Sequence, residues 1–254
     1  MRYSAQLHSQ HGRKHHVLQH QVLSTGIGLG IFGIIGIILV LVTNMAKLDP
    51  GSLFGGFIAS LIRVSVSYVI ATVLALIIAL IITSNRKVEA LLLPLFDVLQ
   101  SFPSFALFPI LVAVLAHQPE AVIILVLVIT MIWPILFTVI GGIKNRREDL
   151  EEAATIFGAV GPKRLSAFTM PSLLPSIITG SIVGWGEGWE FIIGAELLVH
   201  AHLGIGSYLG VLGEARQDSL LALGIFVLML LLFGINKVVW LPLLRQATEY
   251  QTES

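Results

Sequence analysis

The sequence predicts an all-α, polytopic membrane protein with six transmembrane helices. Of its 254 residues, 56% are hydrophobic and only 12% are charged, and the mean hydropathy is +0.91. Soluble domains carry about 25% charged residues, so this chain has too little polar surface to cover a water-soluble globule. Its hydrophobic residues also form long runs, and a membrane-spanning helix needs about 20 of them.

Six segments meet this requirement. The first, at about 23–42, is longer than the apolar core of a signal peptide and has no clear small-residue cleavage site after it, so we expect it to be retained. The third is the weakest, because two prolines interrupt it. The fifth contains several glycines, which allow membrane helices to approach closely. The five later segments are expected at 57–83, 102–116, 121–143, 176–199 and 220–240.

The basic residues predict the orientation. If the N-terminus faces inward, twelve of the 15 Lys and Arg residues lie on cytoplasmic segments, whereas Lys47 and Arg216 lie outside and Arg63 lies near the outer end of the second span. The positive-inside rule then places both termini in the cytoplasm of a cell-membrane protein. We therefore expect a cytoplasmic tail at 1–22, a membrane domain at 23–243 and a second cytoplasmic tail at 244–254.

The loop at 144–175 is longer than the others and has a pattern of its own. Apolar residues recur in it at i, i+3, i+4 and i+7, which predicts an amphipathic helix. Acidic residues are enriched at the N-terminal end of this helix, where the helix dipole favours anions. The residues on the apolar face are Leu150, Ala153, Ala154 and Phe157.

Glycine and proline are expected to divide this loop into two short helices. Gly158 can end the first helix in the left-handed conformation. Gly161 and Pro162 then begin the second, with proline at its first position, and Pro171 and Pro175 are expected to end it. The resulting elbow consists of two helices that are too short to span the membrane. It therefore indicates a docking surface for a soluble cytoplasmic partner.

The same loop resembles the EAA loop of permease subunits of bacterial ABC importers. That motif reads E-A-A, three residues, G, nine residues, I, one residue, L-P. The spacing matches throughout, and the two positions that differ stay apolar. The matching residues here are Glu152, Ala153, Ala154, Gly158, Phe168, Met170 and Pro171.

Other stretches resemble the nitrate, taurine, sulfonate and bicarbonate group of these permeases. The run 100–109 is similar to that group's Q-x-x-P-x-x-A-x-x-P pattern, and the runs 133–136 and 141–143 are similar to its fourth helix. Trp189, Glu196 and the glycines at 204 and 206 resemble its fifth helix and outer loop. Glu187 and Glu190 depart from the pattern, which puts the substrate class in doubt.

The resemblance implies a non-catalytic permease that pairs with a second copy, most simply as a homodimer, in a type I importer. Its partners would be two cytoplasmic ATPase subunits and an extracytoplasmic binding protein. ATP and Mg would bind to the ATPase, since no P-loop pattern occurs in this sequence and no cofactor is expected in this chain. The substrate would be a small solute such as nitrate, bicarbonate, taurine or another sulfonate. The residues expected to couple to the ATPase are Glu152, Ala153, Ala154, Phe157, Gly158 and Pro171.

The translocation pathway is predicted to run along the broken third span and the glycine-rich fifth span, because irregular backbone at membrane depth needs protein or a water-filled cavity around it. Carboxylates within a span are functional candidates by default, and here they would disfavour anions or bind a cation. The alternative is that they pair within the bundle, with Arg63 as a partner, and that the tryptophans pack between helices. The predicted lining residues are Gln100, Pro103, Glu187, Trp189, Glu190 and Glu196.

Two other functions fit this sequence less well. A secondary transporter or channel would need no ATPase, but the sequence has no internal repeat of the kind such folds often show, and the elbow would be unexplained. An intramembrane enzyme would need a catalytic motif, and neither H-E-x-x-H nor G-x-S-x-G occurs. A net charge of zero excludes a basic nucleic-acid surface. The histidines of the N-terminal tail are expected to be interfacial rather than metal ligands.

Overall fold

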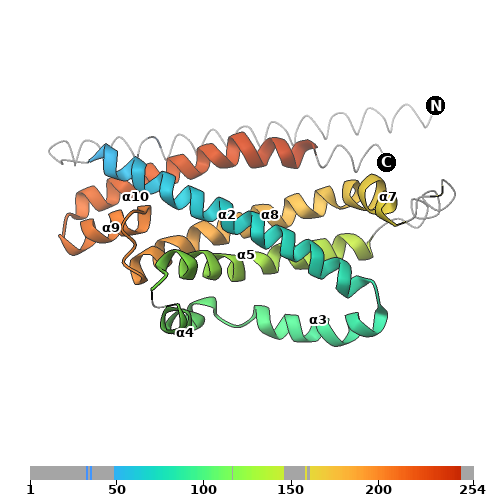
Figure 1. Ribbon diagram of the computed structural model, residues 1–254. Coiled ribbons are helices and arrows are strands. Elements are labelled where there is room, and N and C mark those ends of the chain that lie inside the picture. The colour runs from blue at the N-terminus through green and yellow to red at the C-terminus, as the bar shows by residue number, and fades with distance from the viewer. Residues whose placement is uncertain are drawn as a thin grey trace, which may run out of the picture.

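The computed structural model describes residues 49–115, 117–145, 158 and 161–246, together with Gly33 and Ile35. Within these residues every element is helical (Figure 1). Three long helices form the centre of the bundle, and a fourth long helix lies alongside them. They are α2 (Pro50–Thr83), α5 (Pro119–Lys144), α8 (Met170–Leu198) and α10 (Asp218–Ile235), the last continued by the π-helical η3 (Asn236–Trp240).

The described part contains four helical segments that are long and apolar enough to cross a membrane, at Pro50–Thr83, Pro119–Lys144, Leu165–Leu198 and Asp218–Gln246. They correspond to the predicted second, fourth, fifth and sixth spans. The second begins earlier than expected because the Asp49 side chain accepts a hydrogen bond from the Gly51 backbone N–H at 3.0 Å, with Pro50 at the first helical position. The predicted first span, at 23–42, lies outside the described residues except for Gly33 and Ile35.

The predicted third span, at 102–116, corresponds to only the second arm of a longer bent segment. This segment is a bent pair, α3 (Arg86–Gln100) followed by η1 (Ser104–Leu107) and α4 (Phe108–Val114), with an angle of 84° between the two arms. Pro103 lies at the break, as the proline pattern indicated, because its ring fixes φ and it has no N–H to donate. The missed arm is α3, whose four charged residues lower its hydropathy although a side-chain cap from Asn85 begins it clearly.

The second helix of the elbow does not end where it was predicted to end. Its first turn, α7 (Pro162–Arg164), continues through the π-helical η2 (Leu165–Thr169) directly into α8. Pro171 and Pro175 therefore lie inside one continuous helix. The wider π turn makes this possible, because local π-helical adjustment compensates for the hydrogen bonds that a proline removes from a membrane helix.

The most extensive helix contact joins α5 and α8. A Cβ added at Gly180 would lie 2.8 Å from the Cα of Ile135, and one added at Gly184 would lie 3.0 Å from the carbonyl oxygen of Met131. Gly188, one turn further along, faces the Met131 side chain. These small residues therefore allow the two backbones to touch, as is typical of membrane helix pairs.

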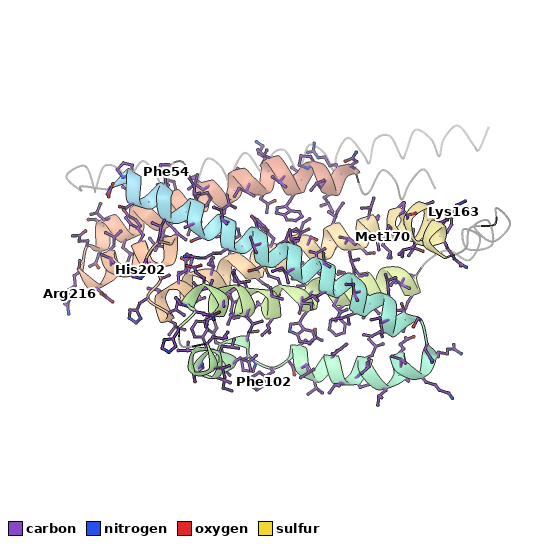
Figure 2. All side chains as sticks on the ribbon, in the orientation of Figure 1. Phe54, Phe102, Lys163, Met170, His202 and Arg216 are labelled. Carbon is purple, nitrogen blue, oxygen red and sulfur yellow. The ribbon has the colours of Figure 1, made fainter. Side chains whose placement is uncertain are left out.

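The two ends of the bundle differ in charge. Figure 2 labels Lys163 and Arg216 at opposite ends. The end that carries Lys163 also holds the start of α3 and the end of α5 (Figure 1). The other end holds the start of α2 and the short helix α9 (Ile205–Glu214). The basic residues gathered at the first end are Arg86, Lys87, Lys144, Lys163 and Arg164.

Candidate functional site

One cavity of about 400 Å³ lies between α3, α5 and α8. Four of the six predicted pathway residues line it, although they come from two parts of the chain that are far apart in sequence. Gln100 and Pro103 stand at the break of the third span, and Glu187 and Glu190 stand one turn apart on α8. The described residues that line it are Gln100, Ser101, Phe102, Pro103, Ser104, Thr130, Trp133, Pro134, Glu187, Glu190 and Phe191.

The break in the third span shapes this cavity. Residues Ser101 to Pro103 carry no helical hydrogen-bond ladder, and all three face the cavity. Opposite them, α5 contributes Thr130, Trp133 and Pro134, which lie near the middle of the 26-residue helix. The cavity therefore occupies the central depth of the bundle, where irregular backbone is tolerated because it borders a cavity.

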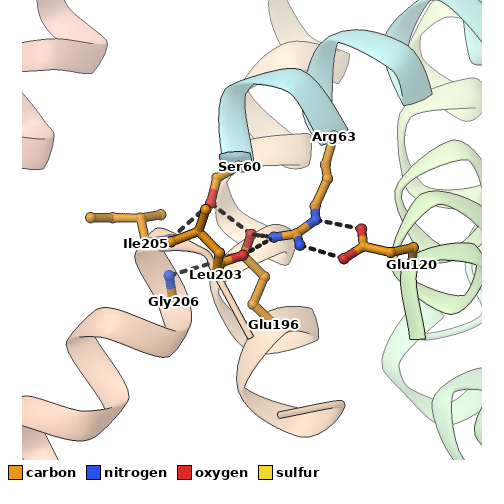
Figure 3. Close-up of polar contacts among 7 residues, drawn as sticks. All are labelled: Ser60, Arg63, Glu120, Glu196, Leu203, Ile205 and Gly206. Carbon is orange, nitrogen blue, oxygen red and sulfur yellow. Dashed lines mark hydrogen bonds and ion pairs between the residues drawn. The ribbon is translucent and has the colours of Figure 1, made fainter. Parts of the chain in front are cut away.

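Glu196 does not line the cavity. It is fully buried and belongs to a polar network that we call the arginine cluster, made of Ser60, Arg63, Glu120 and Glu196 (Figure 3). The Arg63 guanidinium donates two hydrogen bonds to Glu120, from Nε to Oε2 at 2.7 Å and from Nη2 to Oε1 at 2.5 Å. Its Nη1 donates to Glu196 Oε1 at 2.7 Å and to the carbonyl oxygen of Leu203 at 2.5 Å.

The carboxylate of Glu196 is saturated with donors. Oε1 also accepts from the Ser60 hydroxyl at 2.6 Å, and Oε2 accepts from the backbone N–H of Gly206 at 2.8 Å. Ser60 in turn accepts from the backbone N–H of Ile205 at 2.9 Å. A buried carboxylate is tolerated only when it is paired and hydrogen-bonded in this way. The cluster thus joins α2, α5, α8 and the first turn of α9.

Gly204 is required for this arrangement. A Cβ at this position would collide with the carboxylate carbon and oxygens of Glu196, and a Cβ at Gly56 would lie 2.8 Å from the carbonyl oxygen of Gly204. The chain before α9 can therefore pass between α2 and the end of α8 only because positions 56 and 204 are glycines.

Trp189 also lies away from the cavity. Its side chain is buried and stacks on Phe57 of α2, with ring centroids 5.4 Å apart and an interplanar angle of 14°. Its other neighbour is Trp185, at a centroid distance of 6.4 Å in an edge-to-face arrangement. The first contact packs α8 against α2 and the second lies within α8, so Trp189 packs in the bundle, which was the alternative given for the two tryptophans.

Part of the predicted coupling site lies outside the described residues. This applies to Glu152, Ala153, Ala154 and Phe157. Gly158 is described, and its φ of +66° is the left-handed conformation predicted for it. Gly161 has a φ of +55°, and Pro171 lies in the first turn of α8. Among the described residues, no group of three or more His, Cys, Asp or Glu side chains could hold a metal ion.

Sequence reasoning missed Ser60 and Glu120, and it did not assign Thr130 or Trp133 to the pathway. The sequence did contain a signal for Ser60. Ser60, Arg63 and Ser67 fall at i, i+3 and i+7 of an otherwise apolar helix, and all three are buried. Polar residues on one face of a membrane helix point to partners inside the bundle. Nothing in the sequence indicated that Glu120, at the start of α5, would be one of them.

Comparison with known proteins gives a family match over residues 71–241, to the binding-protein-dependent transport system inner membrane component. The bicarbonate transport system permease protein CmpB of Synechococcus elongatus is 36% identical over 163 residues, which cover 64% of this chain and 58% of that protein. The nitrate import permease protein NrtB of Leptolyngbya laminosa is 31% identical over 192 residues, covering 75% and 67%.

The taurine transport system permease protein TauC of Escherichia coli is 26% identical over 175 residues, covering 69% of this chain and 63% of that protein. The chain thus spans less than two thirds of the length of the bicarbonate and taurine permeases that it matches. The matched region contains α5, α8, α9 and α10, the bent third span and the loop at 144–175.

Proposed function

The chain belongs to the family of inner membrane components of binding-protein-dependent transport systems, and we propose that it is the permease subunit of an ATP-driven importer. In this proposal a binding protein delivers a small solute outside the membrane, and the chain provides the pathway through it. Separate ATPase subunits bind ATP and Mg and supply the energy. The permease itself catalyses no reaction.

The observation that carries this proposal is the extent of the family match. Residues 71–241 include most of the described spans, the cavity and the loop that resembles the EAA motif. The architecture supports the same function. A cavity at the central depth of a bundle, beside a helix broken by 84°, is the arrangement in which membrane transporters bind their substrates.

The finer organisation is also part of the proposal. We infer six spans, the first at 23–42, with both termini in the cytoplasm and with the basic end of the bundle facing the cytoplasm. The loop at 144–175 lies at that end, since it leaves α5 at Lys144 and enters α7 at Pro162. Its residues Glu152 to Phe157 would bind a groove on the ATPase, and the left-handed turn at Gly158 would set the angle at which they do so.

A homodimer of this chain is the simplest assembly. The relatives point to the first substrates to examine, because proteins named for bicarbonate, nitrate and taurine transport are similar over most of this chain. Bicarbonate, nitrate, taurine and another sulfonate are therefore the initial panel. A secondary transporter or channel would move its solute without an ATPase, and the experiment below distinguishes the two.

The test is co-purification followed by reconstitution. The chain is expressed with its genomic neighbours, purified in detergent and examined for an associated ATPase, and binding-protein-stimulated ATP hydrolysis is measured in liposomes. Glu152→Arg and Gly158→Asp are expected to lose the ATPase or its stimulation. Two matched controls are Glu151→Arg, which reverses the neighbouring charge, and Gly158→Asn, since asparagine tolerates the left-handed conformation. Transport without an ATPase, unaffected by Glu152→Arg, would show that the chain is a secondary transporter or channel.

A further inference from the structure

We propose that the cavity between α3, α5 and α8 binds its solute through a protonated nitrogen, so that the substrate is an organic amine, either a cation or a zwitterion. This inference rests on the proposed function and deepens it by naming the substrate class. Among the first substrates to examine, it favours an amino-sulfonate such as taurine over nitrate or bicarbonate. The walls of the cavity carry the argument.

The two carboxylates of α8 are the first part of it. Glu187 and Glu190 lie on one face of a membrane-spanning helix and both line the cavity. The ion pairs of the described part use Glu89, Glu120 and Glu196 instead. A carboxylate at membrane depth is costly unless it has a partner or a function. Neither Glu187 nor Glu190 pairs with a basic residue in the described part, so their acceptor oxygens are available to a solute.

Three of the polar side chains around these carboxylates already donate a hydrogen bond to a neighbour in the chain. The amide of Gln100 donates to Asp97 Oδ1 at 2.7 Å. The hydroxyl of Ser101 donates to the carbonyl oxygen of Val98 at 2.7 Å, and that of Thr130 donates to the carbonyl oxygen of Val126 at 2.9 Å. None of the described residues that line the cavity is Lys, Arg or His.

The backbone adds further acceptors. Helix α3 ends at Gln100, so the negative end of its dipole lies at the cavity. On the opposite wall, Pro134 has no N–H, which leaves the carbonyl of Thr130 without its regular helical donor. Half-helix C-termini and unwound carbonyl groups are the features with which membrane transporters bind cations.

Aromatic rings complete the lining. Phe102 comes from the break, Trp133 from α5 and Phe191 from α8, so each wall contributes one ring. The faces of such rings attract ammonium groups, and tryptophan does so most strongly. Nitrate and bicarbonate offer these walls negative charge and oxygen acceptors, which the two carboxylates would repel. An ammonium group offers N–H donors and positive charge, and it meets acceptors from all three helices.

The experiment measures binding to the purified complex, with the fluorescence of Trp133 as the signal and a Trp133→Phe complex as the blank. The probes are one matched pair and one pair of opposite charge. Taurine is compared with isethionate, which has a hydroxyl group in place of the ammonium group, and ethylammonium is compared with nitrate. We expect each amine to bind at least ten-fold more tightly than its partner. Glu187→Gln and Glu190→Gln should each remove most of this difference, whereas Glu214→Gln on α9 should leave it unchanged.

Equal binding of isethionate and taurine would overturn the inference. So would a wild-type complex that binds neither amine, or a preference that survives in the Glu187→Gln and Glu190→Gln double variant. Binding-protein-stimulated ATP hydrolysis is measured on the same preparation. If the ATPase is associated and stimulated but the amine preference is missing, the inference fails while the importer function stands. If no ATPase is associated, the proposed function fails first.

Discussion

Arg63 offers an internal comparison, since one guanidinium holds two carboxylates of opposite exposure. The side chain of Glu196 is 0% exposed, and that of Glu120 is 59% exposed. The two ion pairs have similar lengths, 2.7 and 2.5 Å. Glu196→Gln and Glu120→Gln remove the same charge from the same cation with almost no change of shape. We predict that only the first substitution strongly destabilises the protein.

The structure sets the magnitude. The carboxylate of Glu196 accepts hydrogen bonds from Ser60, Arg63 and the Gly206 N–H. In Glu196→Gln the new side-chain NH₂ group must point either toward Ser60 and Arg63 or toward the Gly206 N–H. Each of these groups is a donor, so one donor then faces another. An unsatisfied buried donor costs about 1–3 kcal/mol, and breaking a buried ion pair costs about 3–5 kcal/mol. Arg63 keeps its ion pair with Glu120 in this variant. We therefore expect the free energy of unfolding to fall by about 3 kcal/mol, at the lower limit for breaking a buried ion pair.

The exposed partner should matter much less. Ion pairs that face solvent contribute about 0.2–1 kcal/mol, so Glu120→Gln is expected to cost less than about 1 kcal/mol despite its bidentate geometry. The free energy of unfolding is measured in detergent by denaturant titration, followed by fluorescence of the buried tryptophans. Equal losses for the two variants, or a loss below about 1 kcal/mol for Glu196→Gln, would refute the reasoning from burial.

Two further predictions concern glycines. Gly180→Ala should destabilise the protein by about 1–3 kcal/mol, because the new methyl group would lie 2.8 Å from the Ile135 Cα and 2.9 Å from the Pro134 carbonyl oxygen; Gly186→Ala, with no atom within 4 Å of its Cβ, is the control in the same denaturant titration. Gly158→Ala should lose about 1–2 kcal/mol in that titration because φ is +66°, and Gly158→Asn should lose less. If Gly180→Ala is as stable as Gly186→Ala, α5 and α8 do not touch as described, and if Gly158→Ala is as stable as wild type, the turn does not need its positive φ.

The hydrophobic spans were predictable because lipid leaves a helix few alternatives. Every backbone group in a membrane must be hydrogen-bonded internally, so a run of about 20 apolar residues specifies both the helix and its place. This argument fails where charges and prolines occur together. The segment 86–100 carries charge at both ends, and hydropathy alone did not reveal that it forms one arm of a bent span. Likewise, Pro171 and Pro175 are ordinary stop signals, and only the π turn before them shows why the helix continues.

The candidate site was also only partly predictable from the sequence. Gln100, Pro103, Glu187 and Glu190 could be chosen from the sequence, because a carboxylate or a broken backbone inside a span needs a reason. The sequence predicted that they line one pathway, but it did not show the 84° bend beside the cavity at which they meet. The pairing of Arg63 with Glu196 joins residues 133 positions apart. Without that contact, Glu196 resembles its two neighbours on α8, although its role is different.

Helix α8 connects three regions of the molecule: the loop at 144–175, the cavity and the arginine cluster. It begins within the segment predicted as the loop at 144–175, carries Glu187 and Glu190 at the cavity, and ends beside Glu196 in the arginine cluster. Because Gly180 and Gly184 bring its backbone against that of α5, a force applied near Gly158 should move the two helices together. Compact cores transmit displacement rather than absorbing it. The wall most able to yield is the break at 101–103, where the regular helical hydrogen bonding of α3 stops. We therefore infer that the cavity changes shape mainly at that break, while the carboxylates of α8 keep their positions relative to Thr130 and Trp133.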